Sequence, residues 1–159
     1  MSFELATPAD TREFGRALAR VLRAGDLVLL TGPLGAGKTA LAQGVGAGLG
    51  VRGEVTSPTF VIARVHRPDP SRGGSIPLVH VDAYRLGGVL EVDDLDLDAD
   101  LGDSVTLVEW GGGLVERLTD AYLEIRISRD DGTEVRRVEL VASGGDWSER
   151  LAALRSRAG

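Results

Sequence analysis

The chain contains no cysteine, and this absence excludes two kinds of structure. Without thiols it can build neither a disulfide framework nor a thiolate metal site, so any metal must take oxygen or imidazole ligands. No apolar stretch approaches the length that spans a membrane. The N-terminal residues 1–4 also lack the basic region and apolar run of a secretory signal. These absences predict a cytoplasmic protein with no membrane association.

The chain has no excess of positive charge and very little lysine. The formal net charge is −6 and the sequence pI is about 4.9, which disfavours unaided tight binding to a nucleic-acid backbone, because phosphate neutralisation needs clustered positive charge. Any role on RNA would therefore require partners. Of the 18 lysines and arginines only one is lysine, Lys38, so we expect position 38 to require an ammonium that arginine cannot replace.

The length and the hydrophobic pattern predict one domain over residues 1–159. Thr7, Pro8 and Asp10 form a helix-start signature, and we expect a helix over 8–24. A strand over 26–31 leads into Gly-Pro-Leu-Gly-Ala-Gly-Lys-Thr, after which a second helix is expected. This second helix is expected over 38–49, and a further helix over 146–157. Three more strands are expected, over 60–66, 78–82 and 105–110.

The three later strands lack clean alternation of apolar and polar residues, which favours burial in a mostly parallel sheet. Segments 122–128 and 134–141 do alternate, and Asp130-Asp131-Gly132 between them predicts a C-terminal β-hairpin. Residues 67–77 are rich in proline and glycine and predict an exposed loop. The fold class is therefore α/β and P-loop NTPase-like: a mostly parallel central sheet flanked by helices, with a C-terminal β-hairpin.

Gly32, Gly37, Lys38 and Thr39 satisfy the pattern G-x-x-x-x-G-K-[ST] between a strand and a helix, which is the context that a phosphate-binding loop needs. Composition alone predicts only about 0.002 chance matches in this chain. Backbone N–H groups of residues 35–39 and the helix N-terminus would face phosphate oxygens. Lys38 would reach the β- and γ-phosphates, and the Thr39 hydroxyl would bind Mg²⁺.

A nucleotide site of this kind also needs an acidic residue at the end of a neighbouring strand to hold the metal. Asp82 follows one apolar run and Glu109 follows another, so both are expected at the carboxyl edge of the sheet. Spacing does not rank the two. Ser57 and Thr59 flank Pro58 shortly after the second helix, where a γ-phosphate-sensing switch would lie, although a simple turn before a strand is the alternative.

Four blocks together resemble the TsaE family of P-loop ATPases: Leu-Gly-Ala-Gly-Lys-Thr at 34–39, Ser-Pro-Thr-Phe at 57–60, His-Val-Asp-Ala-Tyr-Arg at 80–85 and Glu-Trp at 109–110. Their order and approximate spacing are similar to those of the family, and the predicted first helix and hairpin also suit it. The resemblance therefore extends over nearly the whole chain.

The resemblance implies an ATPase that works with TsaB and TsaD to install threonylcarbamoyl on adenosine 37 of tRNAs that read ANN codons, with tRNA contacted only indirectly. It implies ATP and Mg²⁺ as cofactors and low activity without partners. Glu109 would be the acidic Mg²⁺ partner beside Thr39, and Asp82 would assist hydrolysis together with Lys38. The implied nucleotide-binding residues are Leu34, Gly35, Ala36, Gly37, Lys38, Thr39, Ser57, Thr59 and Arg136.

The sequence departs from the family pattern at two positions near the site. Pro33 stands where the family usually has aspartate, and Gly111 stands where proline is frequent.

Two other functions remain open from the residues alone. A small-molecule P-loop kinase would need an acceptor pocket and an arginine-bearing lid, for which residues 64–72 are the candidate. A nucleotide-sensing interaction module would show nucleotide-dependent partner binding without needing hydrolysis.

Overall fold

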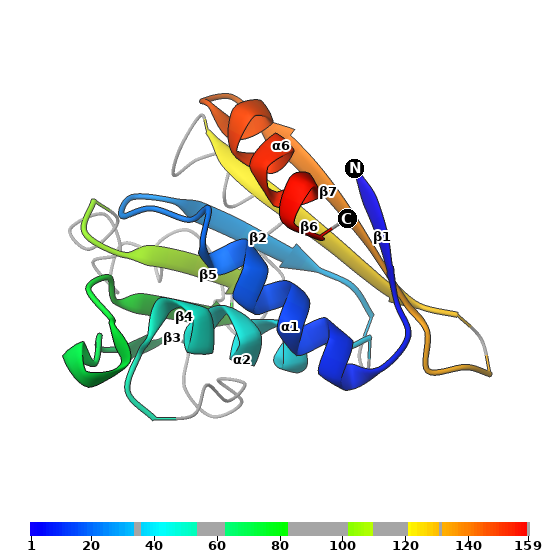
Figure 1. The fold of residues 1–159 in the computed structure, drawn as a ribbon, viewed down its shortest axis with the longest axis horizontal. Helices are drawn as coiled ribbons and strands as arrows, with labels where there is room; N and C mark the ends of the chain where they lie inside the picture. Colours follow the sequence, from blue (N-terminus) through cyan, green and yellow to red (C-terminus); the bar gives the residue numbers. More distant parts are fainter. Residues whose placement is uncertain (34–35, 54–62, 83–101, 110–120, 131, 159) are drawn as a thin grey trace.

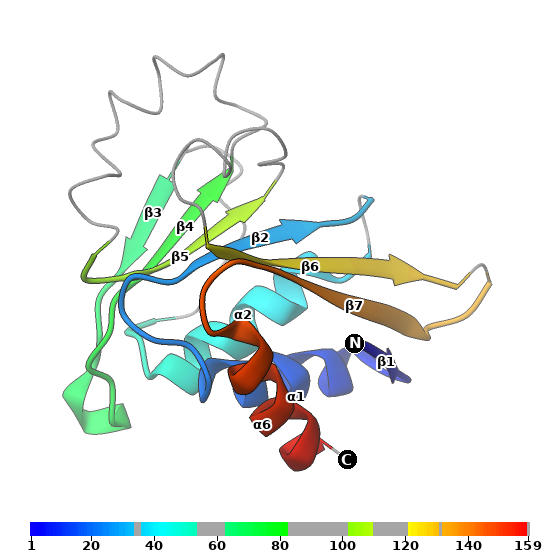
Figure 2. The same cartoon turned by 90° about the horizontal axis from the view of Figure 1, so that it is seen from above.

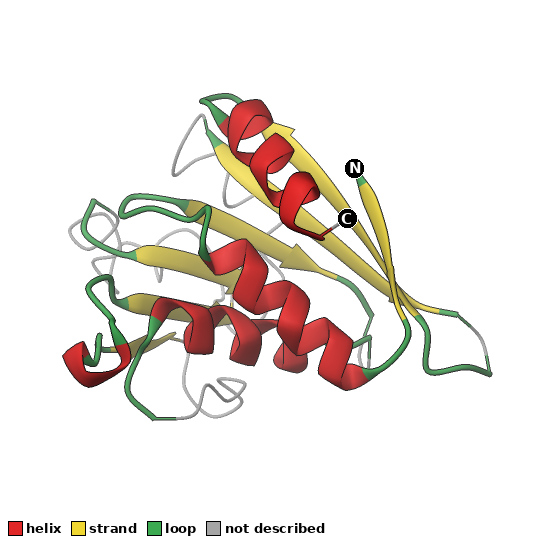
Figure 3. Ribbon diagram, in the orientation of Figure 1, coloured by secondary structure: helices red, strands yellow, loops and turns green. Residues whose placement is uncertain are grey.

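The computed structural model describes residues 1–33, 36–53, 63–82, 102–109, 121–130 and 132–158. In this part of the chain one seven-stranded sheet has the order β1-β7-β6-β2-β5-β4-β3, with three α-helices and a short 3₁₀ helix, as Figures 1 and 3 show. The strands are β1 (Ser2–Leu5), β2 (Leu27–Thr31), β3 (Ala63–His66), β4 (Leu78–Asp82), β5 (Val105–Glu109), β6 (Tyr122–Arg129) and β7 (Arg136–Ser143). The helices are α1 (Pro8–Ala19), α2 (Lys38–Leu49), η1 (Pro70–Arg72) and α6 (Trp147–Ala158).

The sheet is mixed: the prediction of a mostly parallel sheet holds for its centre but not for its outer pairs. Strand β2 is parallel to both β5 and β6, and β4 is parallel to β5. The outer pairs are antiparallel: β3 with β4, β6 with β7, and β1 with β7. The sequence prediction missed β1, because a strand of four residues at a sheet edge alternates too briefly to give a periodic signal. The parallel centre is nevertheless the part that contains the candidate site residues Asp82 and Glu109.

The predicted start of α1 is confirmed, but its predicted end is wrong. Thr7 accepts a hydrogen bond from the Asp10 backbone N–H, and the Asp10 side chain accepts one from the Thr7 backbone N–H, which completes a capping box. The helix ends at Ala19 instead of residue 24. The backbone tightens there into bonds that span three residues, from Val21 to Leu18 and from Leu22 to Ala19, a common way for a last turn to satisfy its carbonyl groups. Val21 and Leu22 remain buried.

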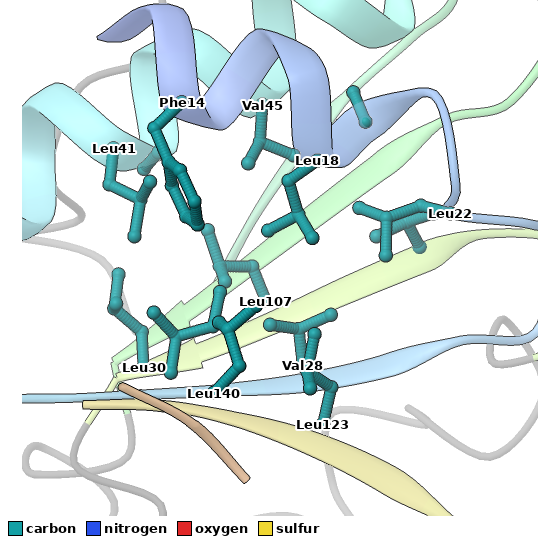
Figure 4. Packing of buried hydrophobic residues seen from close by; sticks show 14 of the residues in the cluster. Phe14, Leu18, Leu22, Val28, Leu30, Leu41, Val45, Leu107, Leu123 and Leu140 are labelled. Carbon is teal, nitrogen blue, oxygen red and sulfur yellow. The ribbon is translucent and has the colours of Figure 1, made fainter. Parts of the chain in front are cut away.

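Helices α1, α2 and α6 all lie on the same face of the sheet (Figure 2). The core between these layers is made of aliphatic residues from both, with Phe14, Leu18, Leu41 and Val45 from the helices above strand residues such as Leu107 (Figure 4). Burial of each such side chain stabilises the fold by about 1.5–3 kcal/mol. This packing fixes α2 against β2, and so fixes the loop that joins them.

Helices α1 and α2 approach each other closely because glycine occupies their contact. A Cβ atom built on Gly44 would collide with the backbone carbonyl of Arg12, and no rotamer change could relieve a clash with backbone. Small residues at such a contact let helix backbones pack without intervening side chains. The missing side chain at Gly44 therefore allows α2 to pack closely against α1, which holds α2 in place.

The C-terminal helix α6 is joined to the core by Arg150. Its guanidinium donates two hydrogen bonds to the Asp26 carboxylate, at 2.5 and 2.8 Å, and one to the Val21 carbonyl at 3.0 Å. It also lies 4.0 Å from the ring centroid of buried Trp147. The Asp26 carboxylate raises the pKa of Arg150 above its ordinary value, with Asp146 contributing further. Asp26 immediately precedes β2, so this pair connects the last helix to the strand that leads into the site.

Candidate functional site

The junction between β2 and α2 holds most of the predicted phosphate-binding residues. Strand β2 ends at Thr31, and α2 begins at Lys38 with Gly37 as its N-cap. Gly37 has φ 107°, in the left-handed region that glycine adopts without strain. It provides no side-chain oxygen to the helix, so the N–H groups of the first turn are left to other acceptors. A helix N-terminus in this arrangement favours an anionic ligand.

Lys38 is buried, with only 7% of its surface exposed, although it lies at the first position of a helix. Ala36 before it is also buried, and its N–H donates to the Pro33 carbonyl at 3.1 Å. Thr39, the predicted Mg²⁺ ligand, is exposed in the same first turn. Burial of a lysine ammonium costs free energy unless an anion compensates it. A buried cation therefore lies in the first turn of α2, the helix end at which phosphate is predicted to bind.

Arg136, at the start of β7, lies against the same N-cap. A Cβ atom on Gly37 would be 3.2 Å from the Arg136 Nε atom, so glycine leaves the space that the guanidinium occupies. The Arg136 side chain is only 9% exposed. Its Nη1 donates to the Glu134 carbonyl at 3.1 Å, and its Nη2 is 3.7 Å from the exposed Glu134 carboxylate. Two buried cations, Lys38 and Arg136, thus border one helix N-terminus.

The two candidate acids lie at neighbouring strand ends. Register pairs Asp82 with Glu109 across β4 and β5, and pairs Glu109 with Leu30 of β2. The Glu109 side chain is 7% exposed and accepts a hydrogen bond from His80 Nε2 at 2.8 Å. Glu109 is therefore one strand away from the residues that open the β2–α2 loop. Of Asp82, the structure describes the backbone and its register.

His80 lies in the expected strand 78–82, but its contact with Glu109 was not predicted from the sequence. The signal is available in the strand pattern. His80 is the register partner of Leu107, and Glu109 lies two residues further along β5, so both side chains project from the same face. Predicting this contact requires knowing that β4 and β5 are neighbours, which the sequence does not specify.

Four predicted site residues lie outside the described part of the chain: Leu34, Gly35, Ser57 and Thr59. Within the described residues, no group of three or more histidine, cysteine, aspartate or glutamate side chains could hold a metal by itself. A site with few protein ligands fits Mg²⁺, which keeps several waters and is usually bound by one or two protein oxygens together with substrate phosphates. The oxygens of Thr39 and Glu109 would serve in this way.

A surface hollow of about 690 Å³ adjoins the end of β2 at Thr31 and Gly32. Its charged groups come from β1, β6 and β7 and are mutually paired. Arg126 contacts Glu124 and Glu139, and Arg137 contacts Asp130 and Glu4. Glu124 raises the pKa of Arg126, and Asp130 raises that of Arg137. These two arginines are thus already matched by carboxylates on the protein.

Among the helices of the described residues, none is long and apolar enough to cross a membrane. In structural comparison, the chain is similar to the crystal structure of Bacillus subtilis YdiB, with a TM-score of 0.78 and 30% sequence identity. That comparison covers 100% of this chain and 96% of the other.

Sequence relatives carry one name. The protein called tRNA threonylcarbamoyladenosine biosynthesis protein TsaE in Streptomyces coelicolor is 62% identical over 141 residues, which cover 86% of this chain and 93% of that protein. Its Bacillus subtilis namesake is 35% identical, covering 92% and 89%. A model of the family described as "Threonylcarbamoyl adenosine biosynthesis protein TsaE" matches residues 5–138. Because the family model, the sequence relatives and the structural comparison agree, the chain belongs to the TsaE family.

Proposed function

We propose that this protein binds ATP and Mg²⁺ in a P-loop between β2 and α2 and hydrolyses ATP in the biosynthesis of threonylcarbamoyladenosine. In this role it acts with TsaB and TsaD on adenosine 37 of tRNAs that read ANN codons. The names of its relatives support the pathway, since each is called a tRNA threonylcarbamoyladenosine biosynthesis protein. The residues at the β2–α2 junction support the nucleotide.

One observation carries the nucleotide assignment: Lys38 and Arg136 are both buried beside the N-terminus of α2. Each cation is 7% exposed, and the helix end adds a partial positive charge of roughly +0.5. Positive charge gathered beside a helix N-terminus favours an anionic ligand there. A polyphosphate has the charge and the acceptor oxygens of such a ligand.

The proposed roles of individual residues are those that the resemblance to the family implies. Residues 34–39 would surround the phosphates with backbone N–H groups, and Lys38 would contact the β- and γ-phosphates. Thr39 and Glu109 would hold Mg²⁺, which supplies charge neutralisation for the transferred phosphoryl group. Asp82 would position the attacking water, and Ser57 and Thr59 would respond to the γ-phosphate.

Charge also shapes the proposed relation to tRNA. With a net charge of −6, the chain is not suited to hold tRNA alone. We therefore assign tRNA contact to the assembled complex, in the cytoplasm, and expect the isolated chain to turn over ATP slowly. This assignment predicts that the purified protein shows no nanomolar, salt-sensitive binding to tRNA.

The proposal is tested by isothermal titration of ATP into the wild-type protein, Lys38→Ala and Lys38→Arg. We expect Lys38→Ala to weaken binding by about 10- to 100-fold, because it removes charge-assisted hydrogen bonds to phosphate. Lys38→Arg should also bind poorly, since a planar guanidinium does not fit the space of a compact ammonium. Exposed Arg20→Ala serves as the control that leaves binding unchanged. Wild-type affinity in Lys38→Arg would contradict the assignment.

The same preparation separates an ATPase from a small-molecule kinase. Release of inorganic phosphate from ATP without any acceptor supports the ATPase, whereas ADP formation that requires an acceptor and transfers the phosphoryl group to it, without release of inorganic phosphate, supports the kinase. Nucleotide-dependent binding to TsaB or TsaD that persists in a hydrolysis-deficient Asp82→Asn variant would instead favour a nucleotide-sensing module.

A further inference from the structure

The contact between His80 and Glu109 is buried to an unusual degree for a polar pair. The His80 side chain is 0% exposed and that of Glu109 is 7% exposed, and 2.8 Å separates His80 Nε2 from Glu109 Oε2. A carboxylate oxygen accepts hydrogen bonds, so Nε2 carries the proton. The other ring nitrogen, Nδ1, has no hydrogen-bond partner among the described residues. The histidine is thus oriented by this one bond.

The hydrogen bond between His80 and Glu109 lies near the carboxyl ends of β4 and β5. His80 projects from β4 on the face that carries Leu107, and Glu109 is the last residue of β5 on the same face. This is the face that α1 and α2 cover, because Leu107 packs beneath them (Figure 4). The bond to Oε2 restricts rotation of the carboxyl group.

We infer that His80 is a positioning residue that orients the Glu109 carboxylate for Mg²⁺. The inference rests on the proposed function, in which Glu109 is the acidic partner of the metal. A hydrogen bond from outside the coordination shell fixes the direction of a ligand and strengthens metal binding. A purely structural His80 would support only packing between β4 and β5. The two roles differ in what they predict for metal affinity.

The central variant is His80→Leu, which keeps an apolar side chain of similar size and removes the N–H donor. We expect the Mg²⁺ concentration for half-maximal ATP binding to rise by roughly tenfold, the lower end of the range for such outer contacts. ATP binding measured without Mg²⁺ should not change. In His80→Gln the amide nitrogen takes the place of Nε2, so this variant should restore most of the Mg²⁺ dependence.

Leu78→Ala is the matched control for a general loss of packing. Leu78 is also fully buried in β4, two residues before His80 and on the same face, and its own register partner is Val105. It should lower thermal stability without raising the Mg²⁺ requirement. If His80→Leu does not fold, His80→Asn replaces it, because the shorter asparagine keeps a polar group but does not reach Glu109.

The experiment titrates Mg²⁺ into the protein with a fluorescent ATP analogue and, separately, measures Mn²⁺ binding to the nucleotide complex by electron paramagnetic resonance. A raised metal requirement in His80→Leu, absent in Leu78→Ala and reversed in His80→Gln, supports the inference. Adding His80→Leu to Glu109→Gln should then have no further effect. Unchanged metal binding in His80→Leu, when Glu109→Gln weakens it, overturns the role of His80 alone. If Glu109→Gln itself leaves metal binding unchanged, the proposed metal site is wrong.

Discussion

The ion pair between Arg150 and Asp26 should contribute strongly to stability, and removing one partner tests this. In Arg150→Met the long apolar side chain still covers Trp147, but Asp26 loses both guanidinium hydrogen bonds. The Asp26 carboxylate would keep the backbone N–H of Arg23, at 2.6 Å, as its described donor. Breaking a buried pair in this way costs about 3–5 kcal/mol.

The structure favours the lower end of that range, about 3 kcal/mol, because the Arg150 and Asp26 side chains retain 11% and 9% exposure and water can partly replace the lost bonds. Unfolding entropy near the midpoint is about 2.1 cal/mol/K per residue, so in a chain of 159 residues each kcal/mol shifts Tm by about 3 °C. The expected fall in Tm is therefore about 9 °C.

Differential scanning calorimetry of wild type, Arg150→Met and Arg23→Ala measures this effect. Arg23 pairs with Asp146 at the surface, with side chains 66% and 46% exposed, and such a pair contributes at most about 1 kcal/mol. Arg23→Ala should therefore shift Tm by no more than about 3 °C. A fall in Arg150→Met no larger than that of Arg23→Ala would refute the argument that burial gives the first pair its greater effect.

Three further predictions concern other contacts. The hydrogen bond from Arg150 lowers the pKa of Asp146 below its ordinary value of 3.8. Because a depressed folded pKa gives stability that is lost as the pH falls through it, Asp146→Asn should reduce the dependence of Tm on pH below about pH 4. Gly44→Ala should destabilise the protein by about 1–3 kcal/mol in urea unfolding, because its methyl group collides with the Arg12 carbonyl. Glu109→Gln should raise the Mg²⁺ requirement for ATP binding, whereas Asp82→Asn should keep binding and lose single-turnover hydrolysis. The reverse pattern would make Asp82 the metal partner.

Local signals in the sequence predicted much of this fold. The capping box at Thr7 and Asp10 depends on residues three apart, and the helix over 38–49 follows directly from the glycine-rich loop, so both were accessible from short range. The order of the strands in the sheet was not predictable from local signals. Edge strand β1 pairs with a distant segment, Leu5 with Arg136, and no local pattern encodes that choice.

In the candidate site too, residues in contiguous motifs were predictable from the sequence and long-range contacts were not. Lys38 was identifiable because its motif is contiguous and because it is the one lysine of the chain. Arg136 was named from resemblance, and its closeness to Gly37 depends on how β7 packs beside the loop. The bond between His80 and Glu109 joins residues 29 positions apart and exists only once β4 and β5 are neighbours. Long-range geometry therefore supplied what the motifs could not.

The central claim, that an ATP-binding member of the TsaE family supports tRNA modification through Lys38, is tested most directly in cells. Bacteria depleted of their own TsaE would be complemented with the wild-type chain or with Lys38→Ala, and threonylcarbamoyladenosine in digested tRNA would be measured by mass spectrometry. The account predicts restoration of the modified nucleoside by the wild type and at most a small fraction of that level with Lys38→Ala at equal protein abundance. Full restoration by Lys38→Ala would contradict it.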